Sequence, residues 1–146
     1  MEQFNSVHFA CHASQNLSQP LESCFHLHDR GLSLADITKR SLKNKGLAFL
    51  SACQTATGDA ESPDEAIHLA AGMLVAGYPT VIATMWSIKD DDAPFVTDIV
   101  YEQITKDGRM DNGRVARALH TAVAALRDQV GEKAFVRRVP YIHLGV

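Results

Sequence analysis

The sequence has few of the residues on which small secreted or metal-stabilised domains depend. It contains 3 cysteines in 146 residues, at positions 11, 24 and 53, and no two of them form a CxxC pair. A disulfide framework normally uses an even and larger number of cysteines, so a secreted disulfide-rich scaffold is disfavoured. The low count fits a reducing compartment, and we expect a cytoplasmic protein.

The sequence also lacks an excess of charge of one sign. Lys and Arg number 14 against 17 Asp and Glu, which gives a formal net charge of −3. That balance provides little basic charge for phosphate contacts, so we expect no nucleic-acid partner. Neither a GxGxxG nor a P-loop motif is present, and a nucleotide cofactor has no support. The first five residues have no basic region, and we expect no signal peptide.

One uncharged run, residues 69–88, is long enough to cross a bilayer. Gly77 and Pro79 predict a turn in its middle, and β-branched residues are frequent in its second half. A helix that leads into a buried strand explains this composition, so we expect no membrane contact.

The composition and the order of segments predict an α/β domain. Hydrophobic residues make up 46% of the chain and charged residues 21%, which is typical of a globular domain with its own core. Apolar strands alternate with helices, an order typical of a mostly parallel sheet with helices on both faces. The predicted elements are strands at 6–11, 46–52, 80–86 and 139–144, a β-hairpin at 25–32, and helices at 34–42, 63–76, 92–105 and 113–130.

A candidate base and a candidate nucleophile each follow a strand of this sheet. His12 comes directly after the first strand, and Cys53 comes directly after the strand 46–52. The carboxyl ends of parallel strands meet at one edge of a sheet, so the two side chains are expected to share a cleft if their strands are neighbours. An imidazole beside a thiol can activate it as a nucleophile. The backbone amides of Ala13 and Cys53 are candidates for holding the oxyanion of a tetrahedral intermediate.

The residues alone leave other interpretations open. A cysteine at a strand end is more often a buried core residue than a nucleophile, and we assign Cys11 and Cys24 to the core on that ground. His12 has the same alternative as a structural histidine. The histidines and cysteines between residues 8 and 28 also suggest a zinc site, but their spacing matches no usual zinc framework.

Several segments together resemble one known family, the CHAT domain, which is a caspase-like peptidase domain often joined to TPR repeats. The resemblance covers nearly the whole chain from residue 6 onward. The segments that carry it are VHFACH at 7–12, Leu34-x-Asp36-Ile37, LSACQTA at 50–56, AGMLVAGYPTVIATMWSIKD at 71–90, the alanine-rich segment 116–122, and Gly145.

The resemblance implies a caspase-like cysteine endopeptidase with a His–Cys dyad and no metal or organic cofactor. His12 matches the family histidine, and Cys53 matches the nucleophile. Asp90, on the segment that begins at Trp86, matches an acidic position that binds a basic residue before the scissile bond in separase-like relatives. We therefore name Asp90 and Trp86 as candidate substrate-binding residues. Asp90 also fits the start of a helix, where a carboxylate complements the helix dipole.

The resemblance also implies a biological setting. It suggests regulatory proteolysis in cell-death or defence signalling, with protein or peptide substrates. A TPR-containing or other upstream sensor segment is the expected partner.

One residue departs from the family pattern. Members often have glycine directly after the histidine, where this chain has Ala13. If that position requires a positive φ, alanine would strain the oxyanion hole. A non-catalytic CHAT-fold interaction module, acting as a scaffold or signalling partner, is therefore the alternative to a peptidase.

The position of His12 has a further implication. In a caspase-like domain, more strands and a helix normally precede the histidine strand, so residues 1–146 are expected to be one CHAT-like domain that lacks the N-terminal strands. We then expect one edge or face of the sheet, near Val7 and Phe9, to be uncovered.

Overall fold

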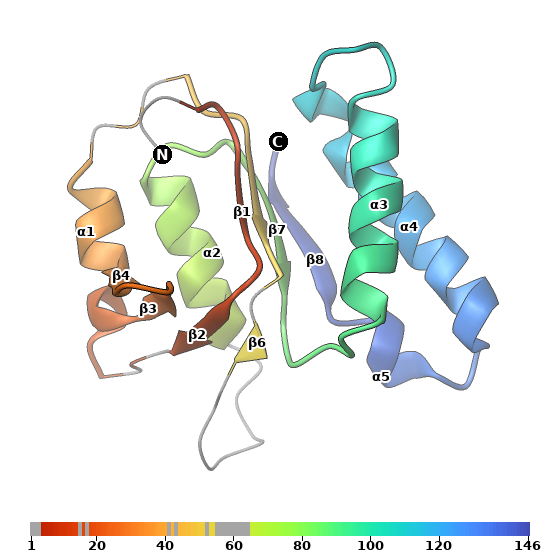
Figure 1. Cartoon of the computed structure of the whole chain (residues 1–146), viewed down its shortest axis with the longest axis horizontal. Coiled ribbons are helices and arrows are strands. Elements are labelled where there is room, and N and C mark those ends of the chain that lie inside the picture. The colour runs from red at the N-terminus through yellow and green to blue at the C-terminus, as the bar shows by residue number, and fades with distance from the viewer. Residues whose placement is uncertain are drawn as a thin grey trace.

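The computed structural model describes most of the chain and contains two β-sheets with their covering helices (Figure 1). The residues described are 4–14, 16, 18–40, 42, 44–51, 53–54 and 65–146, of which 53–54 and 65–68 are described by their backbone alone. The predicted helix start at residues 63 and 64 lies outside them. The strands are β1 Val7–Phe9, β2 His12–Ser14, β3 Cys24–His26, β4 Gly31–Ser33, β5 Leu47–Leu50, β6 Cys53–Gln54, β7 Thr80–Thr84 and β8 Tyr141–Gly145. The α-helices are α1 Leu34–Thr38, α2 Glu65–Val75, α3 Asp92–Ile104, α4 Val115–Val130 and α5 Phe135–Arg138, and the short 3-10 helices are η1 Pro20–Glu22 and η2 Asn112–Arg114.

Sheet A is mostly parallel and has the strand order β1-β5-β7-β8. β1, β5 and β7 run parallel, and β8 joins β7 antiparallel. Helices α1 and α2 lie on one face, and α3 and α4 lie on the other (Figure 1). This arrangement confirms the predicted fold class.

The continuous apolar sequence of the central strands follows from burial on both faces. In β5, Ala48 and Leu50 pack with α1 and α2, while Leu47 and Phe49 pack with α3 and α4. Successive strand residues point to opposite faces, so a strand that lies between two helical layers needs apolar residues at every position.

The turn predicted at Gly77 ends α2 and leads into β7. Gly77 has a φ of +105°. The Tyr78 amide donates to the Met73 carbonyl at 3.1 Å, and the Gly77 amide donates to the Leu74 carbonyl at 3.0 Å. These two bonds form a Schellman motif, which favours glycine at this position. The uncharged run is therefore a helix followed by a buried strand, as predicted.

The search for membrane spans covers the described part of the chain. No helix there combines the length and the apolar character needed to cross a membrane.

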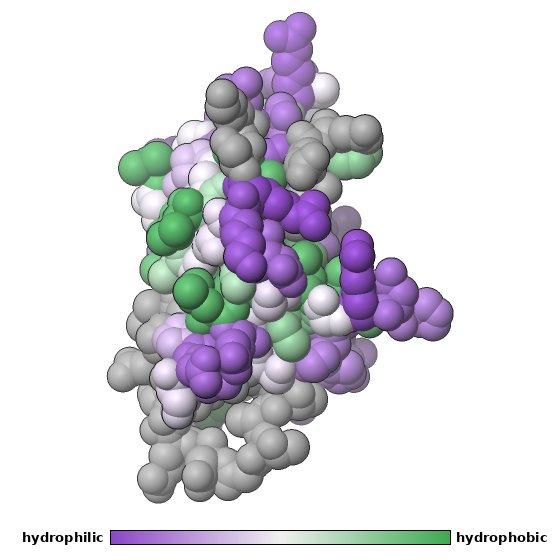
Figure 2. Space-filling view, turned by 90° about the vertical axis from the view of Figure 1, so that its left-hand side faces the viewer, coloured by the Kyte–Doolittle hydropathy of each residue, from purple (hydrophilic) through white to green (hydrophobic). Residues whose placement is uncertain are grey.

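Helix α1 is shorter than predicted and packs closely on α2. It begins after Ser33, whose hydroxyl accepts a hydrogen bond from the Asp36 amide at 3.1 Å. A Cβ at Gly72 of α2 would lie 2.5 Å from the Leu34 side chain, so a side chain there would push the two helices apart. Figure 2 views the end of the molecule that carries α1, where apolar residues are interspersed with hydrophilic ones over the described surface.

Sheet B is the smaller sheet and has the order β4-β3-β2-β6. β3 and β4 form the predicted hairpin, and β2 pairs antiparallel with β3 and parallel with β6. The prediction of one strand over 6–11 is wrong in its C-terminal part, because β1 ends at Phe9 and the chain enters sheet B at His12. The rings of Phe9 and Phe25 stack with centroids 4.3 Å apart, which holds sheet B against the core beside α1 and α2.

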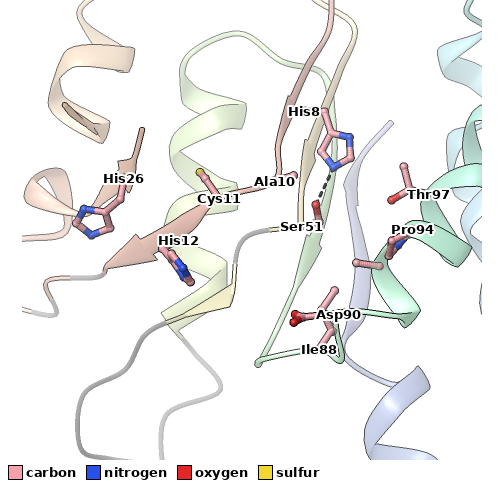
Figure 3. Close-up of a pocket in the computed structure, with 11 residues that line it drawn as sticks. His8, Ala10, Cys11, His12, His26, Ser51, Ile88, Asp90, Pro94 and Thr97 are labelled. Atoms are coloured by element: carbon pink, nitrogen blue, oxygen red, sulfur yellow. Dashed lines mark hydrogen bonds between the residues drawn. The ribbon is translucent and has the colours of Figure 1, made fainter. Parts of the chain in front are cut away.

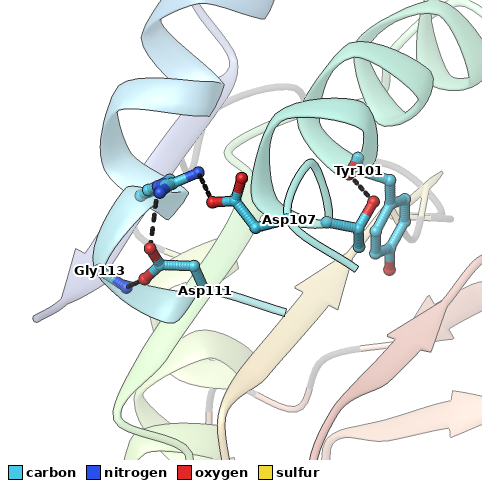
Figure 4. A network of polar contacts seen from close by, with 6 residues as sticks. Tyr101, Asp107, Asp111 and Gly113 are labelled. Carbon is cyan, nitrogen blue, oxygen red and sulfur yellow. Dashed lines mark hydrogen bonds and ion pairs between the residues drawn. The ribbon is translucent and has the colours of Figure 1, made fainter. Parts of the chain in front are cut away.

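A network of exposed ion pairs closes the loop between α3 and α4 (Figure 4). Arg114 lies 2.8 Å from the Asp107 carboxylate and 2.9 Å from the Asp111 carboxylate. Asp111 also accepts a hydrogen bond from the Gly113 amide at 3.0 Å. Exposed pairs of this kind contribute about 0–1 kcal/mol each, so the apolar core between the two helices dominates their packing.

The uncovered edge expected near Val7 lies at β1, which is the edge strand of sheet A among the described strands. The face of β1 that carries Val7 and Phe9 is covered, however, because Phe9 is only 7% exposed and Val7 packs against the core. The open part of β1 is thus its hydrogen-bonding edge.

Candidate active site

His12 and Cys53 are neighbours in a two-stranded parallel ribbon that passes from sheet A to sheet B. In sheet A, Val7 lies opposite Ala48, and in sheet B, His12 lies opposite Cys53. In both sheets, a residue of the first strand (β1 or β2) thus lies opposite the residue 41 positions later in the chain, on β5 or β6. Neighbouring strands are about 4.8 Å apart, so the two predicted residues lie close together. They do so within sheet B, whose strands β2 and β6 follow the carboxyl ends of β1 and β5.

The two faces of sheet B differ in character. Ala13 and Phe25 are fully buried on the inner face. His12 and His26 are register partners on the outer face, and both are exposed. In the backbone register, Cys53, His12 and His26 lie opposite one another across three neighbouring strands.

A cavity of about 500 Å³ lies between this ribbon and the start of α3 (Figure 3). His12 lines it from the ribbon, and Asp90 lines it from the segment that leads into α3. The figure shows them on facing walls of the cavity. The structure therefore brings His12 and Asp90 to one cavity, next to the strand that contains Cys53.

Asp90 and Asp92, both in the acidic run 90–92, have different roles. Asp92 is the first residue of α3 and is only 2% exposed. Its carboxylate binds both arms of the Arg137 guanidinium, with Nε 2.8 Å from Oδ2. Asp90, in contrast, is exposed and lines the cavity. The interpretation as a helix start therefore fits Asp92, and the carboxylate of Asp90 remains directed to the cavity.

Trp86 is placed differently from the other predicted residues. It is absent from the described lining of the cavity that holds His12 and Asp90. Its indole N–H donates to the Val136 carbonyl of α5 at 2.9 Å. Trp86 thus contacts α5 and carries the start of the segment that ends at Asp90.

Ala13 has ordinary strand geometry. Among the described non-glycine residues, only Asn44 has a positive φ. Alanine at position 13 is therefore free of the backbone strain considered above. The replacement of the usual glycine is no conformational argument against an oxyanion hole.

A comparison of the sequence with models of protein families finds a match that includes the residues of this site. The model of the CHAT domain matches residues 1–141. The chain belongs to the CHAT domain family. This membership places it in the caspase-like clan of cysteine peptidases. No curated protein matches the chain.

The other two cysteines of this CHAT domain are only partly buried; Cys11 packs against the core to which it was assigned, whereas Cys24 lies on β3 of sheet B. Cys11 is partly exposed and lines the cavity, and burial of its other side raises the pKa of the thiol. Cys24 is also partly exposed, with its Sγ 3.3 Å from Ser14 Oγ and 3.8 Å from His26 Nε2. Cys24 lies in a strand of sheet B, and Cys11 lies between β1 and β2 at the cavity wall. Chemical labelling must therefore distinguish these thiols from that of Cys53.

The zinc alternative depends on the grouping of metal-binding side chains. Among the residues that the structure describes, no group of three or more His, Cys, Asp or Glu is arranged to hold a metal ion.

A second polar pair of the cavity is absent from the predicted site. His8 Nε2 lies 2.7 Å from Ser51 Oγ, and both residues line the cavity with His12 (Figure 3). Their spacing from His12 and Cys53 in the sequence could have indicated this position. His8 precedes His12 by four residues and Ser51 precedes Cys53 by two, and an even spacing along extended chain favours a common face.

Acidification is expected to destabilise this CHAT domain through two partly buried histidines. Burial lowers the pKa of His8 and of His143 from the ordinary value near 6.5. Below about pH 6.5 the unfolded chain therefore binds more protons than the folded one, so the stability present above that pH decreases as the pH falls. We expect the midpoint of urea unfolding to decrease between pH 7.5 and pH 5.5. The variant His8→Phe, which retains an aromatic ring against Phe49, should show a weaker pH dependence, and an unchanged dependence would contradict this explanation.

Proposed function

We propose that this CHAT domain is a cysteine endopeptidase in which Cys53 attacks the peptide carbonyl and His12 transfers the proton. The observation that carries the proposal is the register of β2 and β6, in which His12 lies opposite Cys53. Membership of a caspase-like peptidase family supports the same assignment. The adjoining cavity of about 500 Å³ offers room for a substrate side chain.

The proposed reaction has two stages. His12 takes the proton of the Cys53 thiol, and the thiolate adds to the carbonyl carbon. The backbone amides of Cys53 and Ala13 hold the oxyanion of the tetrahedral intermediate. His12 then protonates the leaving amine as the C–N bond breaks, which leaves a thioester on Cys53. Water, deprotonated by His12, hydrolyses the thioester and regenerates the thiol, so the reaction needs no metal or organic cofactor.

Asp90 is proposed to recognise a basic residue next to the scissile bond. It is the carboxylate among the described residues of the cavity wall. Ile88, Ala93 and Pro94 supply apolar surface beside it. A Lys or Arg side chain can lay its methylene groups along such surface and place its cation at a carboxylate. Trp86, through its bond to α5, is assigned the role of holding the segment that carries Asp90.

The proposed setting follows from the family alone. The substrate is a protein or peptide, cleaved in a regulatory step of cell-death or defence signalling in the cytoplasm. A TPR-containing or other sensor segment is the proposed regulatory partner.

Labelling with a thiol-reactive peptide that carries Lys or Arg tests the proposal. The wild-type chain should be labelled at Cys53, as identified by mass spectrometry of the digested protein. Cys53→Ala should remove the label, whereas the matched control Cys24→Ser should keep it, since Cys24 lies on β3 and away from β6. Labelling that persists in Cys53→Ala would reject the peptidase and favour the non-catalytic interaction module.

A further inference from the structure

A hydrogen bond between His8 and Ser51 fastens the ribbon just before it enters sheet B. We propose that these two side chains, here named the His8–Ser51 clamp, are positioning residues that keep Cys53 in register with His12. This inference rests on the proposed function of Cys53 and His12. His8 and Ser51 take no part in the proton transfer between His12 and Cys53. They act by fixing the position of the strand that carries Cys53.

The clamp lies where the strand pairing of the ribbon is interrupted. Pairing of β5 with β1 stops at Leu50 and resumes at Cys53. Between them, the Ser51 amide donates to the Phe9 carbonyl at 3.1 Å, and the Ser51 hydroxyl lies 2.7 Å from His8 Nε2. One backbone bond and one side-chain bond thus fix Ser51 to β1, two residues before Cys53.

His8 is a rigid anchor for this hydrogen bond. Its ring stacks on Phe49 with centroids 4.6 Å apart and an interplanar angle of 14°, and the Tyr101 ring of α3 lies 5.9 Å away. A side chain held by packing loses little further freedom when it forms a hydrogen bond, so it can position its partner accurately. Burial lowers the pKa of His8, which keeps the ring neutral near pH 7 and able to donate to or accept from a hydroxyl.

The described part of the strand that carries Cys53 has little capacity to fix its own register. Among the described residues, β6 has 2 residues, and its pairing with β2 covers the positions of Cys53 and Gln54. A slip of one residue would move Cys53 away from His12 and turn it to the other face. Misplacement of a reacting group by about 1 Å can cost roughly 100-fold in rate. The preceding segment, where the clamp lies, is thus proposed to fix the register at Cys53.

The test measures how strongly His12 influences the reactivity of Cys53. In the background Cys11→Ser/Cys24→Ser, Cys53 is the only thiol of the chain, which has 3 cysteines. The rate of alkylation by iodoacetamide at pH 7 is measured with and without His12→Ala, and the ratio of the two rates reports the coupling between His12 and Cys53. Iodoacetamide is small and carries no peptide, so a change in the ratio reports position and not a lost substrate contact.

We expect Ser51→Ala to lower this ratio by roughly 5-fold, the effect of losing one hydrogen bond between neutral groups. His8→Phe should lower it equally, and the double variant should lower it no further, because both changes break the same bond. Ser51→Thr, which keeps the hydroxyl, should restore most of the ratio. A merely structural contribution of Ser51 would give no such rescue.

The control variants are His120→Phe and Thr121→Ala, which remove an imidazole and a hydroxyl from exposed positions of α4. Both should leave the ratio unchanged, and thermal melting checks that each variant is folded. A ratio near 1 in the background protein would reject the dyad itself. A ratio well above 1 that resists both Ser51→Ala and His8→Phe would reject the clamp alone, as would failure of the Ser51→Thr rescue.

Discussion

A His12→Ala variant is expected to cleave peptides about 1000-fold more slowly than the wild-type chain, because general acid–base catalysis contributes roughly 10²- to 10⁴-fold. The proposed reaction uses His12 in every proton transfer, so its loss affects both the attack by Cys53 and the departure of the amine. The measurement is kcat/KM for a fluorogenic peptide with Lys or Arg before the cleaved bond. The loss should fall mainly on kcat, since His12 acts in the transition state and not in ground-state binding.

The neighbouring His26 offers a matched control for this prediction. It is the register partner of His12 in β3, is exposed, and lines the same cavity. Its Nε2 lies 2.9 Å from Ser14 Oγ, and β2 separates its strand from β6. His26→Ala should therefore cost less than about 10-fold, because it removes a lining residue and no proton transfer. Equal losses in the two variants would show that proton transfer is wrongly assigned to His12.

The sequence predicted the parallel sheet well because its central strands have an unmistakable composition. β5 and β7 are buried at every position between two helical layers, so their residues form short apolar runs. Gly77 marked the end of α2 through a backbone conformation that glycine favours. These signals are local, and a local signal can be interpreted from one sequence.

The position of the candidate site was harder to predict. Ala10 and Cys11, where the chain leaves sheet A, include neither glycine nor proline, so nothing in the sequence marks the passage. The described part of β6 has 2 residues, which is too short for any periodic pattern. The proximity of His12 and Cys53 was nevertheless expected, because both follow strands whose carboxyl ends share an edge.

Contacts between distant segments account for the remaining differences. The pairing of Asp92 with Arg137 joins residues 45 positions apart, and the bond from Trp86 to Val136 joins residues 50 positions apart. Both tie the segment around Asp90 to α5, a helix that was not predicted. Such partners are fixed by the packing of whole elements and leave no trace in local spacing.

Phe49→Ala is expected to lower the free energy of unfolding by about 3–5 kcal/mol, the usual cost of removing a buried phenylalanine ring. Phe49 is fully buried on the α3 and α4 side of β5 and contacts the rings of His8 and Tyr101. Its removal leaves a void next to His8, so the clamp should weaken along with the core. Urea unfolding at pH 7.5 measures the first effect, and the His12–Cys53 alkylation ratio in the single-thiol background measures the second.

Two further variants separate packing from stacking in this prediction. Phe49→Leu keeps most of the buried volume and should cost less than about 1.5 kcal/mol, yet it removes the aromatic surface on which the His8 ring stacks. Phe135→Ala removes a phenylalanine that is 56% exposed on α5, and its cost should stay below about 1 kcal/mol even with the loss of the Arg138 contact. Comparable destabilisation by Phe49→Ala and Phe135→Ala would contradict the packing account. A lowered alkylation ratio in Phe49→Leu, with stability nearly intact, would show that the site depends on the orientation of His8 and not only on the stability of the sheet.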